Sequence, residues 1–307
     1  MKSPVLTLLA FCLVATVLSV AAAPLKRADV PANPVWLFHI DCDALRQTYL
    51  GRYLLYQVSK PAMHSNLVAF ESLFSFDYRT QLHGVTVYTE RPFRTNDMAI
   101  IYADIVPDHM AGRLKDSQRA EATTAGQHTV YRWRDQSNPN TTDYAVIQRN
   151  CVITAQDTAS MAAALAAMDG TAPNFLASKA LRELPAAGDA TFLQATARNF
   201  DFVGAEPHAA LLKLAKWAAL RANETNERLD AVLTIELGDE YTATEMSLVA
   251  RGLIAQLSLQ TDNPKAAALA SSISIKRSGN ILTATLSAPS ADLIAALKVY
   301  TAKRDKP

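Results

Sequence analysis

The order of expected elements in this sequence repeats once, and this repetition constrains the fold more than any other feature. Each half reads as strand, helix, strand, strand, helix, hairpin and helix. The ends of the two halves also align without a gap, because residues 152–155 (VITA) match residues 281–284 (ILTA). We therefore predict an internal duplication. Short turns between neighbouring strands favour two mainly antiparallel sheets, each covered by helices on one face, which is the α+β class.

Apolar spacing and turn residues place the individual elements. The strands expected in the first half are 35–41, 84–89, 98–104, 128–134, 144–148 and 151–155, and its helices are 45–58, 67–76, 107–115 and 159–168. The strands expected in the second half are 190–197, 231–237, 273–276 and 281–286, with a short one near Tyr241, and its helices are 209–220, 246–257 and 291–299. Asp43 is the expected N-cap of the first helix, and Thr242 with Glu245 has the spacing of a capping box.

These elements divide the chain into segments. The expected segments are a signal peptide over 1–22, a leader over 23–33, a first α+β repeat over 34–170, a helical linker over 171–188, a second α+β repeat over 189–300 and a charged tail over 301–307.

The first 22 residues have the layout of a secretory signal peptide. Lys2 gives a positive start, residues 5–20 are an almost uninterrupted apolar run, and small residues allow cleavage after Ala21 or Ala22. We expect a periplasmic or secreted protein that has lost Cys12 with the signal. The alternative is an uncleaved anchor, because residues 5–23 approach the roughly 20 residues that span a bilayer as a helix.

Charge argues against a nucleic-acid partner. The whole chain has a formal charge of +1, and Lys2 is the single charged residue of the first 22, so the mature chain has 1 − 1 = 0. A nucleic-acid binder needs an excess of Lys and Arg to displace counterions. We expect no nucleic-acid partner, and another envelope protein is the partner we consider.

Two cysteines remain in the mature chain, Cys42 and Cys151. In an oxidising compartment such a pair can form one disulfide. The alternative is two buried, unpaired thiols that behave as small apolar side chains. The sequence leaves both open, because it does not give the distance between the two Cα atoms.

The sharpest local cluster of polar side chains is His39-Ile40-Asp41-Cys42-Asp43. Imidazole, carboxylate and thiol are the ligand types that metals use, and an extended strand would place His39, Asp41 and Asp43 on one face. The simpler interpretation, which we favour, is an apolar strand that ends in a polar turn, and we expect no bound metal.

Recognisable catalytic motifs are missing from the sequence. It has no HExxH, no paired CxxC, no GxSxG, no P-loop and no GxGxxG, and its other histidines are scattered singly. We therefore expect neither catalytic residues nor a cofactor.

Residues 128–134 (HTVYRWR) form an alternating strand with a candidate binding surface made by Tyr131, Arg132, Trp133 and Arg134. Tyr, Trp and Arg dominate binding hot spots. The interpretation we prefer is an ordinary strand whose two aromatic side chains enter the core and whose two arginines face water.

Two stretches of the first half resemble a group of exported bacterial proteins of unknown function. One stretch is DCDALR (41–46), followed by Leu50-Gly51 and Leu54-Leu55, and the other is FDYR (76–79), followed by LHGVTVY (82–88). The resemblance implies export and a two-part α+β body, and it implies no known reaction, cofactor or catalytic residue.

We therefore expect an exported, non-catalytic protein, periplasmic or associated with the cell envelope, that binds another macromolecule or has a structural role. Two alternatives stay open. One is a carrier of a small apolar ligand, because apolar helices over an antiparallel sheet can enclose a pocket. The other is a metal-dependent hydrolase that uses His39, Asp41 and Asp43.

Overall fold

The computed structural model describes residues 23–60, 76–91, 97–116, 120–134, 142–148, 150–176, 190–198, 200, 212–259, 261 and 263–304. The signal peptide, residues 67–75 of the expected helix 67–76, and linker residues 177–188 lie outside these ranges.

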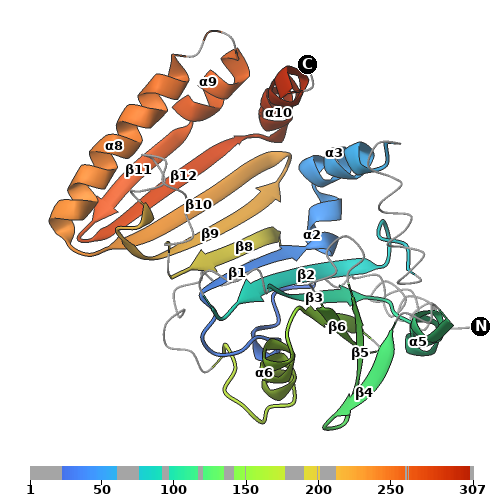
Figure 1. Cartoon of the computed structure of the whole chain (residues 1–307). Coiled ribbons are helices and arrows are strands. Elements are labelled where there is room, and N and C mark those ends of the chain that lie inside the picture. Colours follow the sequence, from blue (N-terminus) through green and yellow to red (C-terminus); the bar gives the residue numbers. More distant parts are fainter. Residues whose placement is uncertain are drawn as a thin grey trace, which may run out of the picture.

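The described strands form one twelve-stranded sheet in which all neighbours are antiparallel (Figure 1). The strands are β1 (Trp36–Asp41), β2 (Leu82–Thr89), β3 (Met98–Ala103), β4 (Glu121–Ala125), β5 (His128–Arg134), β6 (Thr142–Ile147), β7 (Cys151–Ala155), β8 (Thr191–Ala197), β9 (Ala215–Thr225), β10 (Arg228–Leu237), β11 (Ile273–Ser278) and β12 (Ile281–Pro289). The helices are η1 (Arg27–Asp29), α2 (Cys42–Gln47), α3 (Tyr49–Val58), α5 (Pro107–Asp116), α6 (Thr158–Met168), α8 (Glu240–Ser258), α9 (Pro264–Ser271) and α10 (Ser290–Arg304). The expected α+β class with antiparallel pairing is confirmed.

The strand order of the sheet is β11-β12-β10-β9-β8-β1-β2-β3-β7-β6-β5-β4. Read outward from the centre, the first half gives 1-2-3-7-6-5-4 and the second half gives 8-9-10-12-11. The five inner strands of each half therefore follow the same order, and β5 and β4 extend the first half beyond it. The first strands of the halves, β1 and β8, pair with each other, with Phe38 opposite Ala195. The strands of both halves thus join a single sheet, where the sequence suggested a separate sheet for each. Duplication as the origin of this symmetry stays a prediction.

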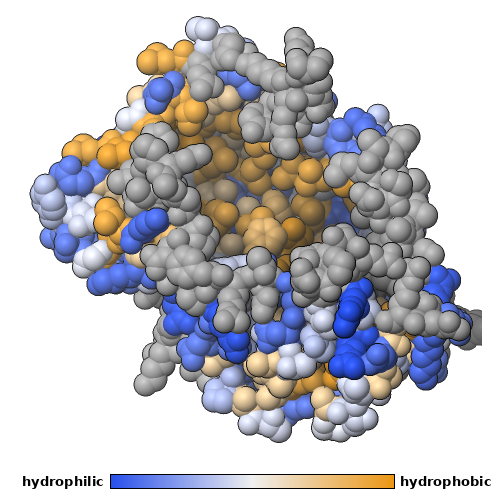
Figure 2. Space-filling view, viewed as in Figure 1, coloured by the Kyte–Doolittle hydropathy of each residue, from blue (hydrophilic) through white to orange (hydrophobic). Residues whose placement is uncertain are grey.

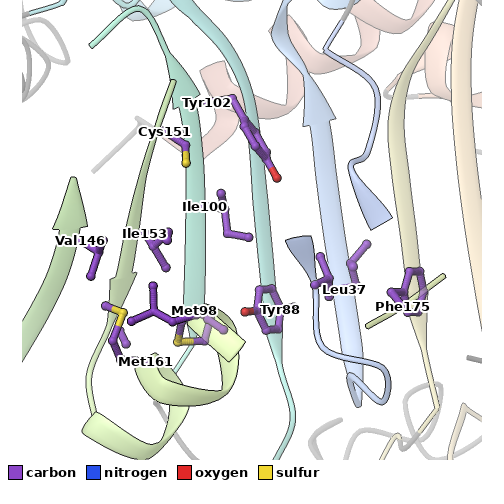
Figure 3. Close-up of a cluster of buried hydrophobic side chains, with 14 of the residues drawn as sticks. Leu37, Tyr88, Met98, Ile100, Tyr102, Val146, Cys151, Ile153, Met161 and Phe175 are labelled. Atoms are coloured by element: carbon purple, nitrogen blue, oxygen red, sulfur yellow. The ribbon is translucent and has the colours of Figure 1, made fainter. Parts of the chain in front are cut away.

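One face of the first half is covered by η1 and α6. Leu37, Tyr88, Ile100 and Ile153 point to this face and form a buried cluster with Met161 of α6 (Figure 3). Helix α6 is apolar nearly all round because it is alanine-rich, as expected for a helix packed closely against its sheet.

The opposite face carries the remaining clusters. Helices α2, α3 and α10 cover one end of it through Leu50 and Ile294, and α8 covers another part through Met246 (Figure 1). Strand β10 alternates accordingly. Leu233 and Ile235 face these helices, whereas Thr234 and Glu236 point to the other face, as is typical of an antiparallel strand with one solvated face.

Several local predictions are wrong. Residues 215–220, expected to be helical, belong to strand β9, and Tyr241, expected near a strand, lies in α8. Alanine-rich sequence favours a helix locally, but pairing with β8 and β10 overrides this weak preference. Strand β4 and helix α9 were not expected.

The helix starts also differ from the prediction. Strand β1 runs through Asp41, so Asp41 caps α2 in place of Asp43. Asp239 caps α8, in place of the capping box at Thr242 and Glu245. At the chain end, α10 extends through Arg304 into the expected tail. Linker residues 171–176 are turns around a bridge between Pro31 and Asn174 and are not helical.

The leader belongs to the folded body. Val30 is fully buried in the cluster under α6, and its carbonyl accepts the backbone N–H of Phe175. The Tyr102 hydroxyl donates to Asp29 at 2.8 Å, and Lys26 lies over the Tyr102 ring. The segment after the expected cleavage site therefore completes the core.

Candidate functional site

A cavity of about 700 Å³ lies over the central strands, on the face that carries α3, α8 and α10. Figure 2 shows the corresponding hollow, lined by apolar side chains, between these helices. The lining residues are Val35, Trp36, Leu37, Phe38, Val87, Thr89, Arg91, Asp97, Ala195, Thr196, Ala197, Ala218, Ala219, Leu220 and Leu233. Its volume falls within the roughly 300–1,000 Å³ of ligand pockets.

Strand register builds the floor of the cavity. One row across the sheet runs Leu233, Leu220, Ala195, Phe38 and Val87, each directly opposite the next. Because these residues are cross-strand partners, their side chains project from the same face of the sheet. The row crosses the β1–β8 pair, so both halves of the chain contribute to the floor.

A second row on the same face runs Ala218, Ala197 and Trp36. Because the alanine side chains are small, they leave room for the cavity above them. Trp36 and Phe38 supply large apolar surfaces to its lining. This combination suits an apolar molecule, because burying apolar surface on binding releases it from water.

Polar groups at the cavity are few. The Thr196 hydroxyl donates to the carbonyl of Ala218 at 3.0 Å, so its proton does not need a ligand atom as acceptor. Arg91 and Asp97 are exposed members of the lining. The cavity wall removes part of the water from around the Asp97 carboxyl, and this partial desolvation raises its pKa above the usual value. The lining of the cavity is therefore mainly apolar, and its charged side chains belong to exposed residues.

His39, singled out as a metal ligand, is buried and uses both ring nitrogens within the protein. Nε2 lies 3.0 Å from the carbonyl oxygen of Ala23, which can only accept, so Nε2 carries the proton. Nδ1 then accepts from the Thr86 hydroxyl at 2.9 Å. Burial lowers the pKa of His39 to about 4, so the ring is neutral at physiological pH.

The three candidate ligands do not form a metal site. His39 and Asp41 point to the same face of β1, but Asp43 lies in α2 and not on the strand, which contradicts the geometry expected for the hydrolase alternative. Among the residues described by the structure, no group of three His, Cys, Asp or Glu side chains could hold an ion.

Asp43 instead holds a network that the sequence did not reveal. Its buried carboxylate accepts from Arg46 and lies 2.9 Å from Nδ1 of His83, while Nε2 of His83 lies 3.1 Å from Asp104. Arg46 also donates to the carbonyl of Leu82. The network ties α2 to β2 and to the end of β3, and His83 was among the scattered histidines of the sequence.

Cys42 and Cys151 are both free. Asp41, Gly84, Tyr102 and Cys151 are successive partners across β1, β2, β3 and β7. Three strand spacings of about 4.8 Å separate the ends of this row, well beyond the roughly 7 Å that a disulfide spans between Cα atoms. Cys42 follows Asp41, so of the two alternatives the fold has the unpaired thiols.

The candidate surface on β5 is divided between core and solvent. Tyr131 is buried and Trp133 packs partly against an apolar cluster, while Arg132 and Arg134 are exposed. Arg132 donates to Glu121 of the neighbouring β4 at 2.9 Å. This arrangement is the ordinary strand preferred from the sequence, and it provides no continuous aromatic and arginine surface.

Within the described part of the chain, the helices are all too short or too polar to cross a membrane.

The fold is that of an α+β protein with one large antiparallel sheet. Among solved structures it is similar to TP0453. Crystal form III of TP0453 matches with a TM-score of 0.52 and 10% sequence identity, over 91% of this chain and 98% of that one. Crystal form IV matches with a TM-score of 0.49 and 10% identity, over 91% and 97%.

At this identity the likeness to crystal form III shows the fold alone. No protein family model matches the sequence, and no curated protein sequence matches it. The resemblance to exported bacterial proteins of unknown function stays a prediction.

Proposed function

We propose that this chain is an exported, non-catalytic binding protein that carries a small apolar molecule in the cavity over β1 and β8. The observation that carries the proposal is the composition of the cavity, whose floor is Trp36, Phe38, Leu220 and Leu233 with alanines between them. Such pockets are few in a protein and mostly pre-formed.

The chemistry of the lining indicates the class of ligand. A polar substrate would need convergent hydrogen-bonding groups, whereas the Thr196 hydroxyl is already bonded and the charges of Arg91 and Asp97 belong to exposed residues. A hydrocarbon chain of the fatty-acid type fits this distribution, because its tail would replace water over the floor while a polar end reached Arg91.

The first experiment is native mass spectrometry of the protein purified without detergent from cells that export it, followed by solvent extraction. Additional mass at fixed stoichiometry, released as a lipid-like molecule, supports the proposal. A displacement titration with cis-parinaric acid, a fluorescent fatty acid, then measures affinity for the emptied cavity.

A matched pair of variants locates the binding site. Ala195→Trp places a bulky side chain on the cavity floor, and we expect at least tenfold weaker binding of the probe. Ala122→Trp makes the same change on the fully exposed strand β4 and should bind as the parent does. Equal binding by the parent and Ala195→Trp, with both folded by circular dichroism, would contradict the proposal.

An envelope partner stays a separate prediction. If the exported protein has the bare polypeptide mass and does not bind the probe, cross-linking in the exporting cells is the experiment that tests for a macromolecular partner.

A further inference from the structure

Ala23, the first residue that the structure describes, is held by three groups of the folded body. Its carbonyl oxygen lies 3.0 Å from Nε2 of the buried His39. Gly84 leaves the space for it, since a Cβ atom there would lie 3.4 Å from both the Cβ and the carbonyl oxygen of Ala23. Burial raises the pKa of the Asp41 carboxyl, and a backbone hydrogen bond from Ala23 acts in the opposite direction. The position of this residue is therefore fixed on both sides of its Cα.

Asp41 is a buried carboxylate, only 2% exposed. One of its oxygens caps α2 by accepting from the backbone N–H of Ala44 at 2.8 Å. Backbone N–H groups of Asp43 and Ala23 also support its charge, while the Asp43 carboxylate opposes it. These groups include no cation, although an opposite charge close by would favour the ionised form of the carboxyl group.

We propose that a signal peptidase cleaves this chain after Ala22 and that the new α-ammonium group of Ala23 forms an ion pair with Asp41. Water hydrolyses the peptide bond between the two alanines. Ala22 receives the carboxylate, and Ala23 receives an amine that takes up a proton at neutral pH. The backbone nitrogen of Ala23, an amide before cleavage, thereby becomes a positively charged ammonium group next to Asp41.

The structure also selects between the two cleavage positions that the sequence allows. Cleavage after Ala21 would leave an amide at Ala23 and place the charge on the next residue, about 3.8 Å farther along the chain. Cleavage after Ala23 would put Pro24 first and would remove the residue that His39 binds. The proposal rests on the expected signal peptide and is independent of the apolar ligand.

N-terminal sequencing and intact mass of the exported protein give the first test. A chain that begins at Ala23 is expected, and a chain that begins elsewhere or keeps its signal overturns the proposal.

The second test compares chains that begin at Ala23 or at Ala22, each released from a fusion by a protease that leaves no extra residue. Both are made with Asp41 and with Asp41→Asn, because asparagine keeps an acceptor for the Ala44 N–H and is itself a good N-cap. With Asp41, the Ala23 chain should melt about 2–4 °C higher than the Ala22 chain. In the two Asp41→Asn chains this difference should disappear.

A third measurement does not depend on the folding of the Asp41→Asn variant. Pairing with a carboxylate raises the pKa of an amine, so the α-amine of the Ala23 chain should react about tenfold more slowly with an acylating reagent at pH 7 than that of the Ala22 chain. Equal melting temperatures and equal acylation rates would overturn the ion pair.

Discussion

The carboxylate of Glu224 in β9 accepts the backbone N–H of Leu50 at 3.1 Å, although the two residues are 174 positions apart in the sequence. It also accepts the N–H of Tyr49, the first residue of α3. Glu224 is buried and belongs to the second half of the chain. The second half therefore supplies the hydrogen-bond acceptor for the first N–H groups of a helix in the first half.

We expect Glu224→Ala to lower the free energy of unfolding by about 2–3 kcal/mol, because it leaves two N–H groups at a buried helix start without an acceptor. Glu224→Gln keeps one acceptor and should cost about 1 kcal/mol. Urea unfolding measures both. Glu227→Gln is the control, since Glu227 is exposed and its change should stay within about 0.5 kcal/mol. Equal effects of Glu224→Ala and the control would contradict this role.

Stability should fall with pH below about 6.5 because of His39. Burial lowers its pKa to about 4, so the unfolded chain takes up the proton first as the pH falls. The stabilisation is present above pH 6.5 and is lost as the pH falls towards 4, by about 3 kcal/mol in total. Burial raises the pKa values of Asp41, Glu90 and Asp97, and their protonation opposes this loss.

The pH effect is therefore measured as a difference between two proteins. His39→Gln keeps an N–H donor for Ala23 but does not titrate. Its unfolding free energy should depend less steeply on pH between 6.5 and 4 than that of the parent. Parallel curves for the two proteins would show that His39 is not the titrating group.

Both thiols of the mature chain should resist modification in the native state. Burial raises the pKa of Cys42 to about 12 and that of Cys151 to about 11, so very little thiolate exists at pH 8. We expect two thiols to react with Ellman's reagent in denaturant without any reductant, and fewer than that in the native protein over the same time. If no thiol reacted after unfolding, Cys42 and Cys151 would have formed a disulfide, which would contradict the strand register.

The leader should contribute to stability as a core element does. Val30 is fully buried, and Val30→Ala removes two methyl groups, which should cost about 2 kcal/mol. Val106→Ala is the matched control because Val106 is 48% exposed, and it should change the free energy of unfolding little. Thermal or urea unfolding compares the two, and similar losses would mean that the leader is not packed as described.

Local sequence was enough to predict most of the strands and their hairpins. Residues 273–286 alternate around Ser278-Gly279-Asn280, and they form β11 and β12 as expected. Gly279 has a φ of 57°, the left-handed conformation that glycine adopts easily in such a turn. The information for these elements lies within a few neighbouring residues.

Features that depend on distant pairing could not be predicted. Ala215, Ala218 and Ala219 favour a helix by composition, and only the neighbouring strands show that they belong to β9. The cavity has the same origin, since Phe38 and Ala195 come together through the pairing of β1 with β8. Apolar residues of this kind look like ordinary core residues in the sequence, so no motif marks the site.

The pairing of β1 with β8 has a consequence for how the two halves depend on each other. The cavity floor takes Phe38 and Val87 from one half and Ala195, Leu220 and Leu233 from the other, so neither half contains the site alone. A molecule bound there would stabilise only the state in which both halves are joined, by an amount that grows with its concentration relative to its dissociation constant. Ligand binding would thus stabilise the pairing of β1 with β8, and loss of the ligand would lower the stability of the sheet at its centre.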